Sequence, residues 1–68
     1  MNLSEKKLKW IIEQVGLGYT VYLTTYTKAT KITGKHVAQL RVRGDNLEVQ
    51  HGKKWLNHNH SHLSAQRN

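Results

Sequence analysis

A chain of 68 residues forms one small domain, and its eleven Lys and Arg against four Asp and Glu give a formal net charge of +7. The absence of cysteine excludes disulfides and thiolate metal sites. No apolar run approaches the roughly 20 residues of a membrane-spanning helix, and the first apolar cluster, short and interrupted by lysines, does not predict a signal peptide. We therefore expect a cytoplasmic protein with polyanionic partners, for which a homodimer is one way to bury more apolar surface.

The first predicted element is a helix over residues 4–15. Ser4 has a hydroxyl suited to an N-cap, because it can accept a hydrogen bond from an amide of the first turn. The apolar residues that follow recur at helical spacing: Leu8, Ile11, Ile12 and Val15. Gly16 and Gly18 are expected to end the helix, and Trp10 is expected to widen its packed face.

Residues 19–57 predict a glycine-punctuated antiparallel β-meander, an open barrel or curled sheet of about four or five short strands. The first strand separates Val21 and Leu23 on one face from Tyr22 and Tyr26 on the other. If the aliphatic pair points inward, the tyrosines lie on the open side close to Lys28 and Lys31, which suits base stacking and phosphate contact. The alternative is a sheet covered on both faces, with both tyrosines in the core.

Residues 33–40, which include Lys35, permit either a short helix beginning at Thr33 or a turn at Gly34 that leads into a strand. A helix-turn-helix motif is rejected, because Gly44 forms a turn where the second helix would have to begin.

A hairpin is predicted around residues 44–46. An even-length loop pairs Val42 with Leu47 and Leu40 with Val49, whereas a slip of one residue would send these apolar side chains to the wrong face.

The same pairing places Arg41 beside Glu48 and leaves Arg43 without an acidic partner, which makes Arg43 the better phosphate ligand. Residues 28–43 carry five Lys or Arg and no acid, whereas the helical segment is nearly neutral. This asymmetry favours a binding face over general solubilisation.

The next turn, at His51-Gly52-Lys53, presents Lys53 and Lys54 as a cationic tip. Trp55 and Leu56 point to opposite faces of the following strand. The favoured interpretation places Trp55 in the core, and the alternative makes it a stacking residue beside Lys53 and Arg43.

The histidines His58, His60 and His62 alternate and would share one face of an extended strand. Three imidazoles at this spacing are weak candidates for a metal site. A titrating or simply polar final strand is the favoured interpretation. The compact domain is expected to span residues 1–63, with residues 64–68 as a disordered tail.

These observations predict a small basic α+β protein without enzymatic activity or cofactor, acting as a regulatory nucleic-acid-binding module for DNA or RNA. Phosphate contacts are assigned to Lys28, Lys31, Lys35, Arg41, Arg43, Lys53 and Lys54, and base stacking to Tyr22, Tyr26 or Trp55. The alternative is an adaptor or inhibitor of the phage- or plasmid-encoded type, which binds a host protein through Trp10, Trp55 and the tyrosines. The third hypothesis is a metal-binding protein that uses His58, His60 and His62, which we call the histidine row.

Overall fold

The structure, a computed structural model, describes residues 2–67. An N-terminal helix, α1 (Leu3–Gly16), precedes six strands and a short 3₁₀ helix. In chain order these are β1 (Tyr19–Thr24), β2 (Ala29–Ile32), the 3₁₀ helix η1 (Gly34–Gln39), β3 (Leu40–Arg43), β4 (Asn46–His51), β5 (Lys54–Asn57) and β6 (His62–Arg67). The predicted α+β class, with a helix before a small curled antiparallel sheet, is confirmed. Neither helix of the described residues has the length and apolar character required to cross a bilayer.

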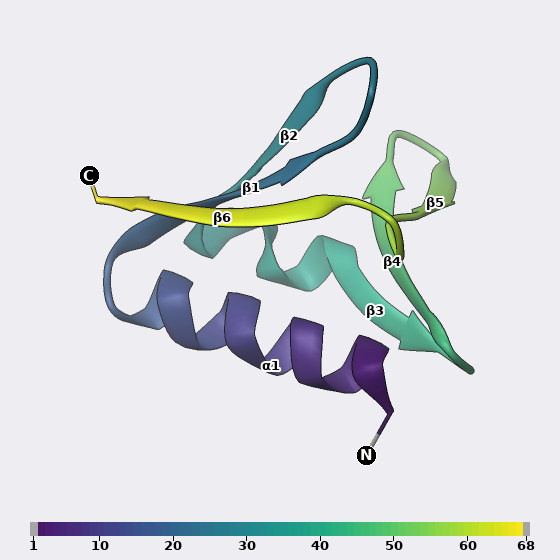
Figure 1. The fold of residues 1–68 in the computed structure, drawn as a ribbon, viewed down its shortest axis with the longest axis horizontal. Coiled ribbons are helices and arrows are strands. Elements are labelled where there is room, and N and C mark those ends of the chain that lie inside the picture. The colour runs from purple at the N-terminus through teal and green to yellow at the C-terminus, as the bar shows by residue number, and fades with distance from the viewer. Residues whose placement is uncertain (1, 68) are drawn as a thin grey trace.

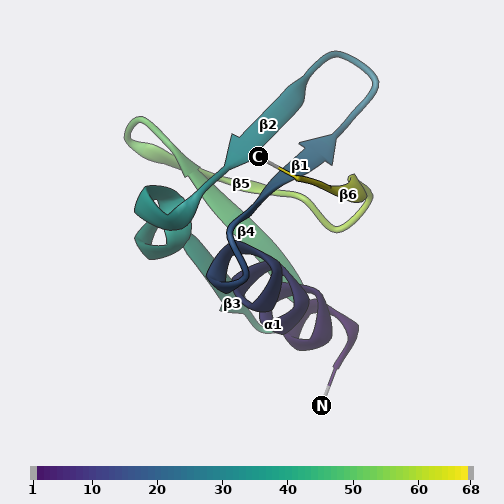
Figure 2. The same ribbon diagram turned by 90° about the vertical axis from the view of Figure 1, so that its left-hand side faces the viewer.

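The strands form two three-stranded antiparallel sheets. Sheet A has the order β2-β1-β6 and sheet B the order β3-β4-β5. Helix α1 lies along one side of both sheets (Figure 1), and the β1–β2 and β4–β5 turns extend away from it (Figure 2). One face of each sheet is therefore free of the helix.

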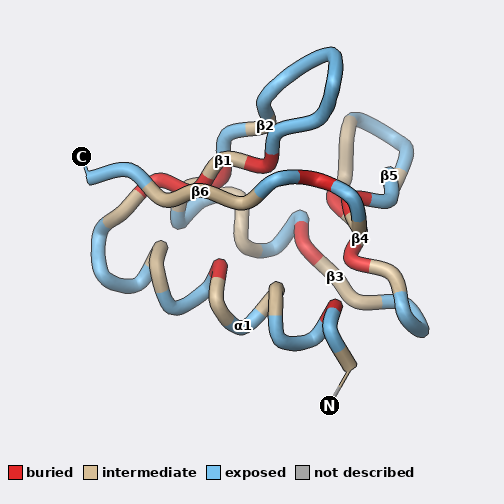
Figure 3. Tube along the Cα trace, in the orientation of Figure 1, coloured by how far each residue is buried: buried red, intermediate tan, exposed pale blue. Residues whose placement is uncertain are grey.

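The helix and the two sheets share one core. Its buried side chains come from α1 and from strands β1 to β4: Ile11, Val21, Leu23, Ile32, Leu40, Leu47 and Val49. Figure 3 shows buried segments in the strands and exposed tips at the β1–β2, β3–β4 and β4–β5 turns. Trp10 packs against this core, as predicted.

The helix begins earlier than predicted, because its N-cap is Asn2 and not Ser4. The Asn2 Oδ1 accepts a hydrogen bond from the Glu5 amide at 2.8 Å, the capping interaction expected of Asn. The buried Ser4 hydroxyl donates instead to the carbonyl of Asp45 in the β3–β4 turn. Ser4 therefore joins α1 to sheet B. The helix ends at Gly16, as predicted.

The predicted β3–β4 hairpin is confirmed in register, with Val42 opposite Leu47 and Leu40 opposite Val49. Gly44 occupies the first position of its two-residue loop with a φ of 60°. A residue with a Cβ rarely adopts this conformation, which explains why glycine marks the turn.

Residues 33–40 form neither a regular α-helix nor a continuous strand. Gly34–Gln39 is a 3₁₀ helix that leads directly into β3. Thr33 precedes it, and the Thr33 amide donates to Nδ1 of His36 at 3.0 Å.

The prediction of a disordered tail is wrong for residues 64–67, because they belong to β6. Strand β6 pairs with β1 along its length, and places Leu63 opposite Leu23 and Ala65 opposite Val21. The inward side chains of this strand are one leucine and one alanine, which is a weak sequence signal for a strand. The strand forms because β1 offers an open edge with which it can pair. Met1 and Asn68 lie outside the described residues.

Candidate nucleic-acid interface

The free face of sheet B gathers polar and aromatic side chains. Leu40, Leu47 and Val49 are buried on its inner side, so the residues that alternate with them point outward. We call this surface the sheet B outer face; its residues are Arg41, Arg43, Asn46, Glu48, Gln50, Trp55 and Asn57.

An arginine held between a carboxylate and an indole lies at the centre of this face. Arg41 Nε lies 2.7 Å from Glu48 Oε1, and the Arg41 guanidinium carbon lies 4.0 Å from the centroid of the Trp55 ring. The ion pair predicted for Arg41 and Glu48 is therefore present. With the Arg41 side chain 38% exposed, the pair contributes little to stability. The pair holds the guanidinium over the indole ring, and the Arg41 side chain stays partly open to solvent.

The structure corrects the favoured interpretation of Trp55. Trp55 lies opposite Gln50, on the outer face of sheet B and outside the core. Its neighbour Leu56 takes the inner side opposite Val49, yet Leu56 is 40% exposed because β5 is an edge strand. Trp55 therefore takes the outer position that the alternative interpretation gave it. Its stacking partner is Arg41 and not Arg43 or Lys53.

Arg43 lies on the same face, two residues beyond Arg41, and is exposed. Its cross-strand partner is Asn46, and the one ion pair found among residues 2–67 is that of Arg41. Lys53 is exposed at the β4–β5 tip, at the opposite end of sheet B. Lys54 pairs with His51 and points to the other side of the sheet from Trp55.

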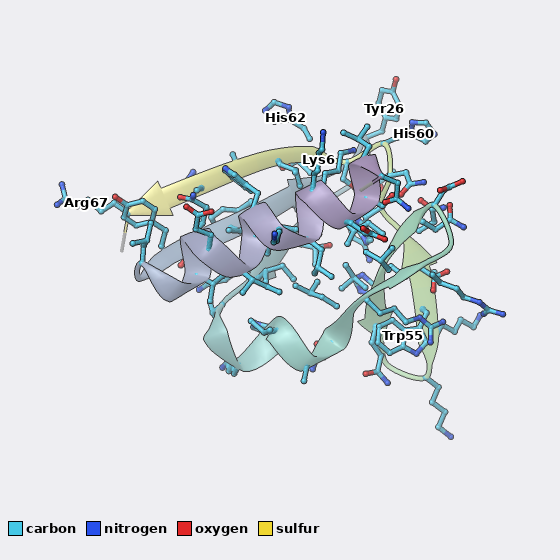
Figure 4. The ribbon with its side chains drawn as sticks, turned by 90° about the horizontal axis from the view of Figure 1, so that it is seen from below. Lys6, Tyr26, Trp55, His60, His62 and Arg67 are labelled. Carbon is cyan, nitrogen blue, oxygen red and sulfur yellow. The ribbon has the colours of Figure 1, made fainter. Side chains whose placement is uncertain are left out.

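The remaining candidates lie elsewhere. Tyr22 and Lys31 are cross-strand partners on sheet A, as the proposed interleaving of aromatic and basic residues requires. Tyr26 and Lys28 lie in the β1–β2 turn, which the Thr25 amide closes by donating to the Lys28 carbonyl at 2.8 Å. Lys35 lies on η1. Figure 4 shows Trp55 well separated from Tyr26. The candidate residues therefore do not form a single face. Tyr22 and Lys31 lie together on sheet A, and the sheet B outer face is the part where a guanidinium lies directly over an aromatic ring.

The histidine row is not a strand, so its members do not share a face. Residues 58–61 form the turn between β5 and β6, and only His62 belongs to β6. His58 is buried, whereas His60 and His62 are exposed. Within residues 2–67 no group of three potential metal ligands comes together.

His58 has two side-chain partners that the sequence did not indicate. Its Nδ1 lies 2.7 Å from the Ser61 hydroxyl, and its Nε2 lies 3.2 Å from Nε2 of His51 in β4. Burial lowers the pKa of His58, and the positive charges of His51 and Lys28 lower this pKa further. The neutral imidazole is therefore the favoured form, and it ties the β5–β6 turn to sheet B.

Asn59 is the residue that sequence reasoning missed, since it reads as a spacer between histidines. Its Oδ1 accepts the Leu47 amide at 2.8 Å, and its Nδ2 donates to the Asp45 carbonyl at 3.1 Å and to Asn46 Oδ1 at 3.0 Å. The Asn59 carbonyl accepts from Lys7 Nζ of α1 at 2.7 Å. One side chain and its carbonyl thus join the β5–β6 turn to sheet B and to the helix. An Asn between two histidines carries no sequence signal for this role.

Comparison of the chain with family models, curated proteins and solved structures finds no match.

Proposed function

We propose that this protein is a non-catalytic, regulatory module of the cytoplasm that binds single-stranded nucleic acid on the sheet B outer face. The observation that carries the proposal is the Arg41–Trp55 stack, 4.0 Å from guanidinium carbon to ring centroid, on a sheet face free of the helix. Arg41 and Trp55 supply stacking surfaces for bases, and Arg43 and Lys53 supply phosphate contacts.

The charge distribution supports a polyanionic partner. Residues 19–68 hold eight Lys and Arg and two Asp and Glu, a balance of +6 out of the total of +7. One of the two acids, Glu48, is already paired with Arg41. The positive potential of the β-rich part is thus nearly uncompensated, which favours association with phosphate chains.

A single strand fits this face better than a duplex. Guanidinium and indole planes stack on bases that are not stacked on one another, as in single strands and loops. Arg43 and Lys53 lie at opposite ends of sheet B, and the flexible phosphate backbone of a single strand can reach both of them.

The salt dependence of binding tests the proposed phosphate contacts. The affinity for a short oligothymidylate should fall with salt concentration, and Arg43→Gln and Lys53→Gln should each reduce the slope of log K against log salt by about 0.7. Fluorescence anisotropy over a salt series measures both slopes.

Lys6→Gln is the matched control, because it removes the same charge from α1, where Lys6 is exposed (Figure 4). Its salt slope should equal that of the wild-type protein. Equal slopes for all three variants would refute the assignment of Arg43 and Lys53. An absence of binding even at low salt would favour the adaptor hypothesis, with Trp55 and Tyr26 as protein-contacting anchors.

A further inference from the structure

A cavity of about 630 Å³ opens where the β1–β2 turn meets the β5–β6 turn. Its lining includes Thr24, Tyr26, Asn57, His60, Ser61 and His62. Its size is within the range of pockets that hold small organic ligands, roughly 300–1,000 Å³. No local sequence pattern marks this cavity, because its lining comes from two segments far apart in the chain, residues 24–26 and 57–62.

Three of the side chains that line the cavity carry rings: Tyr26, His60 and His62. Tyr26 is fully exposed in the turn after β1, and His60 is exposed on the turn before β6. Figure 4 shows Tyr26 and His60 projecting at the same corner of the molecule, with His62 farther along β6. A phenol ring and imidazole rings around an open cavity suit a flat heteroaromatic ligand, which can stack on them.

Other side chains that line the cavity carry hydrogen-bonding groups. The Asn57 Oδ1 accepts the Asn59 amide at 2.7 Å, which leaves the Asn57 Nδ2 group to donate to a ligand edge. The Thr24 side chain supplies a hydroxyl. Ser61 is committed elsewhere, since its hydroxyl lies 2.7 Å from His58 Nδ1. The amide and hydroxyl together match the donor and acceptor edge of a nucleobase.

The cavity adjoins the sheet B outer face. Asn57 belongs to both, and it follows Trp55 on the same side of β5. The strand rise places these two residues about 6.6 Å apart along β5. A nucleic-acid strand stacked on the Arg41–Trp55 pair can therefore continue into the cavity without crossing the sheet.

We propose that this Tyr26–His60 cavity is a second subsite, which holds one unstacked base of the strand bound on sheet B. The inference rests on the function proposed above. The subsite extends the proposed interface from sheet B to the β1–β2 turn of sheet A. Tyr26 is too far from Trp55 to stack a base on the sheet B outer face, but it can stack one in the cavity.

The test compares two ligands of equal length, a short oligothymidylate and a strand of abasic sugar phosphates. Tyr26→Ala should weaken binding of the oligothymidylate about fivefold to a hundredfold and leave binding of the abasic strand unchanged. Tyr26→Phe, which retains the ring, should bind both strands as the wild-type protein does. Because the Tyr26 side chain is fully exposed, neither variant should change the melting temperature.

The outcomes separate the two proposals. If the wild-type protein binds the oligothymidylate but Tyr26→Ala binds it equally well, or loses affinity equally for both strands, the subsite is refuted and the sheet B interface stands. If the wild-type protein binds neither strand at low salt, both proposals fail. Photocrosslinking of a 5-iodouracil strand to Tyr26 or His60 would support the subsite, and crosslinking confined to Trp55 would count against it.

Discussion

Replacing Trp55 with alanine should weaken binding of single-stranded nucleic acid by about fivefold to a hundredfold, the range that follows from the loss of one base–aromatic stack. The expectation rests on the position of the indole, outside the core and beneath the Arg41 guanidinium. The substitution also frees Arg41 to move, although its ion pair with Glu48 remains. Titration of a labelled oligothymidylate by fluorescence anisotropy measures the effect.

Leu56→Ala provides the matched control for Trp55→Ala. Leu56 is the next residue of β5, is 40% exposed and lies on the opposite side of the strand. Its truncation should leave the affinity unchanged, while Trp55→Phe should retain part of the wild-type affinity. Comparable losses for Leu56→Ala and Trp55→Ala would indicate damage to β5 in general and would remove the case for stacking.

Replacing Asn59 with alanine should lower the free energy of unfolding by about 2–4 kcal/mol, because it leaves the amide of the buried Leu47 without its acceptor. The bonds from Asn59 to Asp45 and Asn46 in the β3–β4 turn are lost as well. A domain of 68 residues has about 3–10 kcal/mol of stability in total. The variant should therefore lose a large share of its stability, as the lower urea midpoint in a titration followed by circular dichroism would reveal.

Two variants isolate the hydrogen bonds of Asn59. Asn59→Asp retains an acceptor for the Leu47 amide and loses the donors, so its stability should lie between those of the wild-type protein and the alanine variant. His60→Ala changes the exposed neighbouring side chain and should leave the urea midpoint unchanged. A stability of Asn59→Ala within about 0.5 kcal/mol of the wild-type value would show that the network has no structural importance.

The β3–β4 hairpin was predictable from sequence because several local signals agree. A glycine at the turn, alternating aliphatic residues on both sides and a complementary Arg41–Glu48 pair all specify the same register. The helix over most of α1 was predictable for the same reason, since its apolar spacing and the terminal Gly16 coincide.

The remaining errors arise where tertiary partners decide the local structure. Strand β6 has one leucine and one alanine facing inward, and it is ordered because β1 offers an unpaired edge. Ser4 has a side chain suited to an N-cap, but its hydroxyl donates a hydrogen bond to the Asp45 carbonyl, and Asn2 caps the helix instead. In both cases the partner is distant in sequence: β1 is far from β6, and Asp45 is far from Ser4.

The candidate site was predictable in its residue types and not in its arrangement. Arg41, Arg43 and Trp55 were singled out from the sequence, and they share one face. The position of Trp55 was ambiguous, because Trp55 and Leu56 are both apolar and alternation alone does not say which one points inward. The histidine row is not a strand. Residues 58–61 form a turn, which the Asn59 hydrogen bonds to Asp45 and Leu47 stabilise.

The most direct test of the account is a nuclear magnetic resonance titration of the ¹⁵N-labelled protein with unlabelled oligothymidylate at low salt. We expect the largest shift changes at the indole N–H of Trp55 and at the amides of Arg41, Arg43 and Gln50, which share the sheet B outer face. Unchanged spectra at low salt, or changes centred on α1, would contradict the proposed interface.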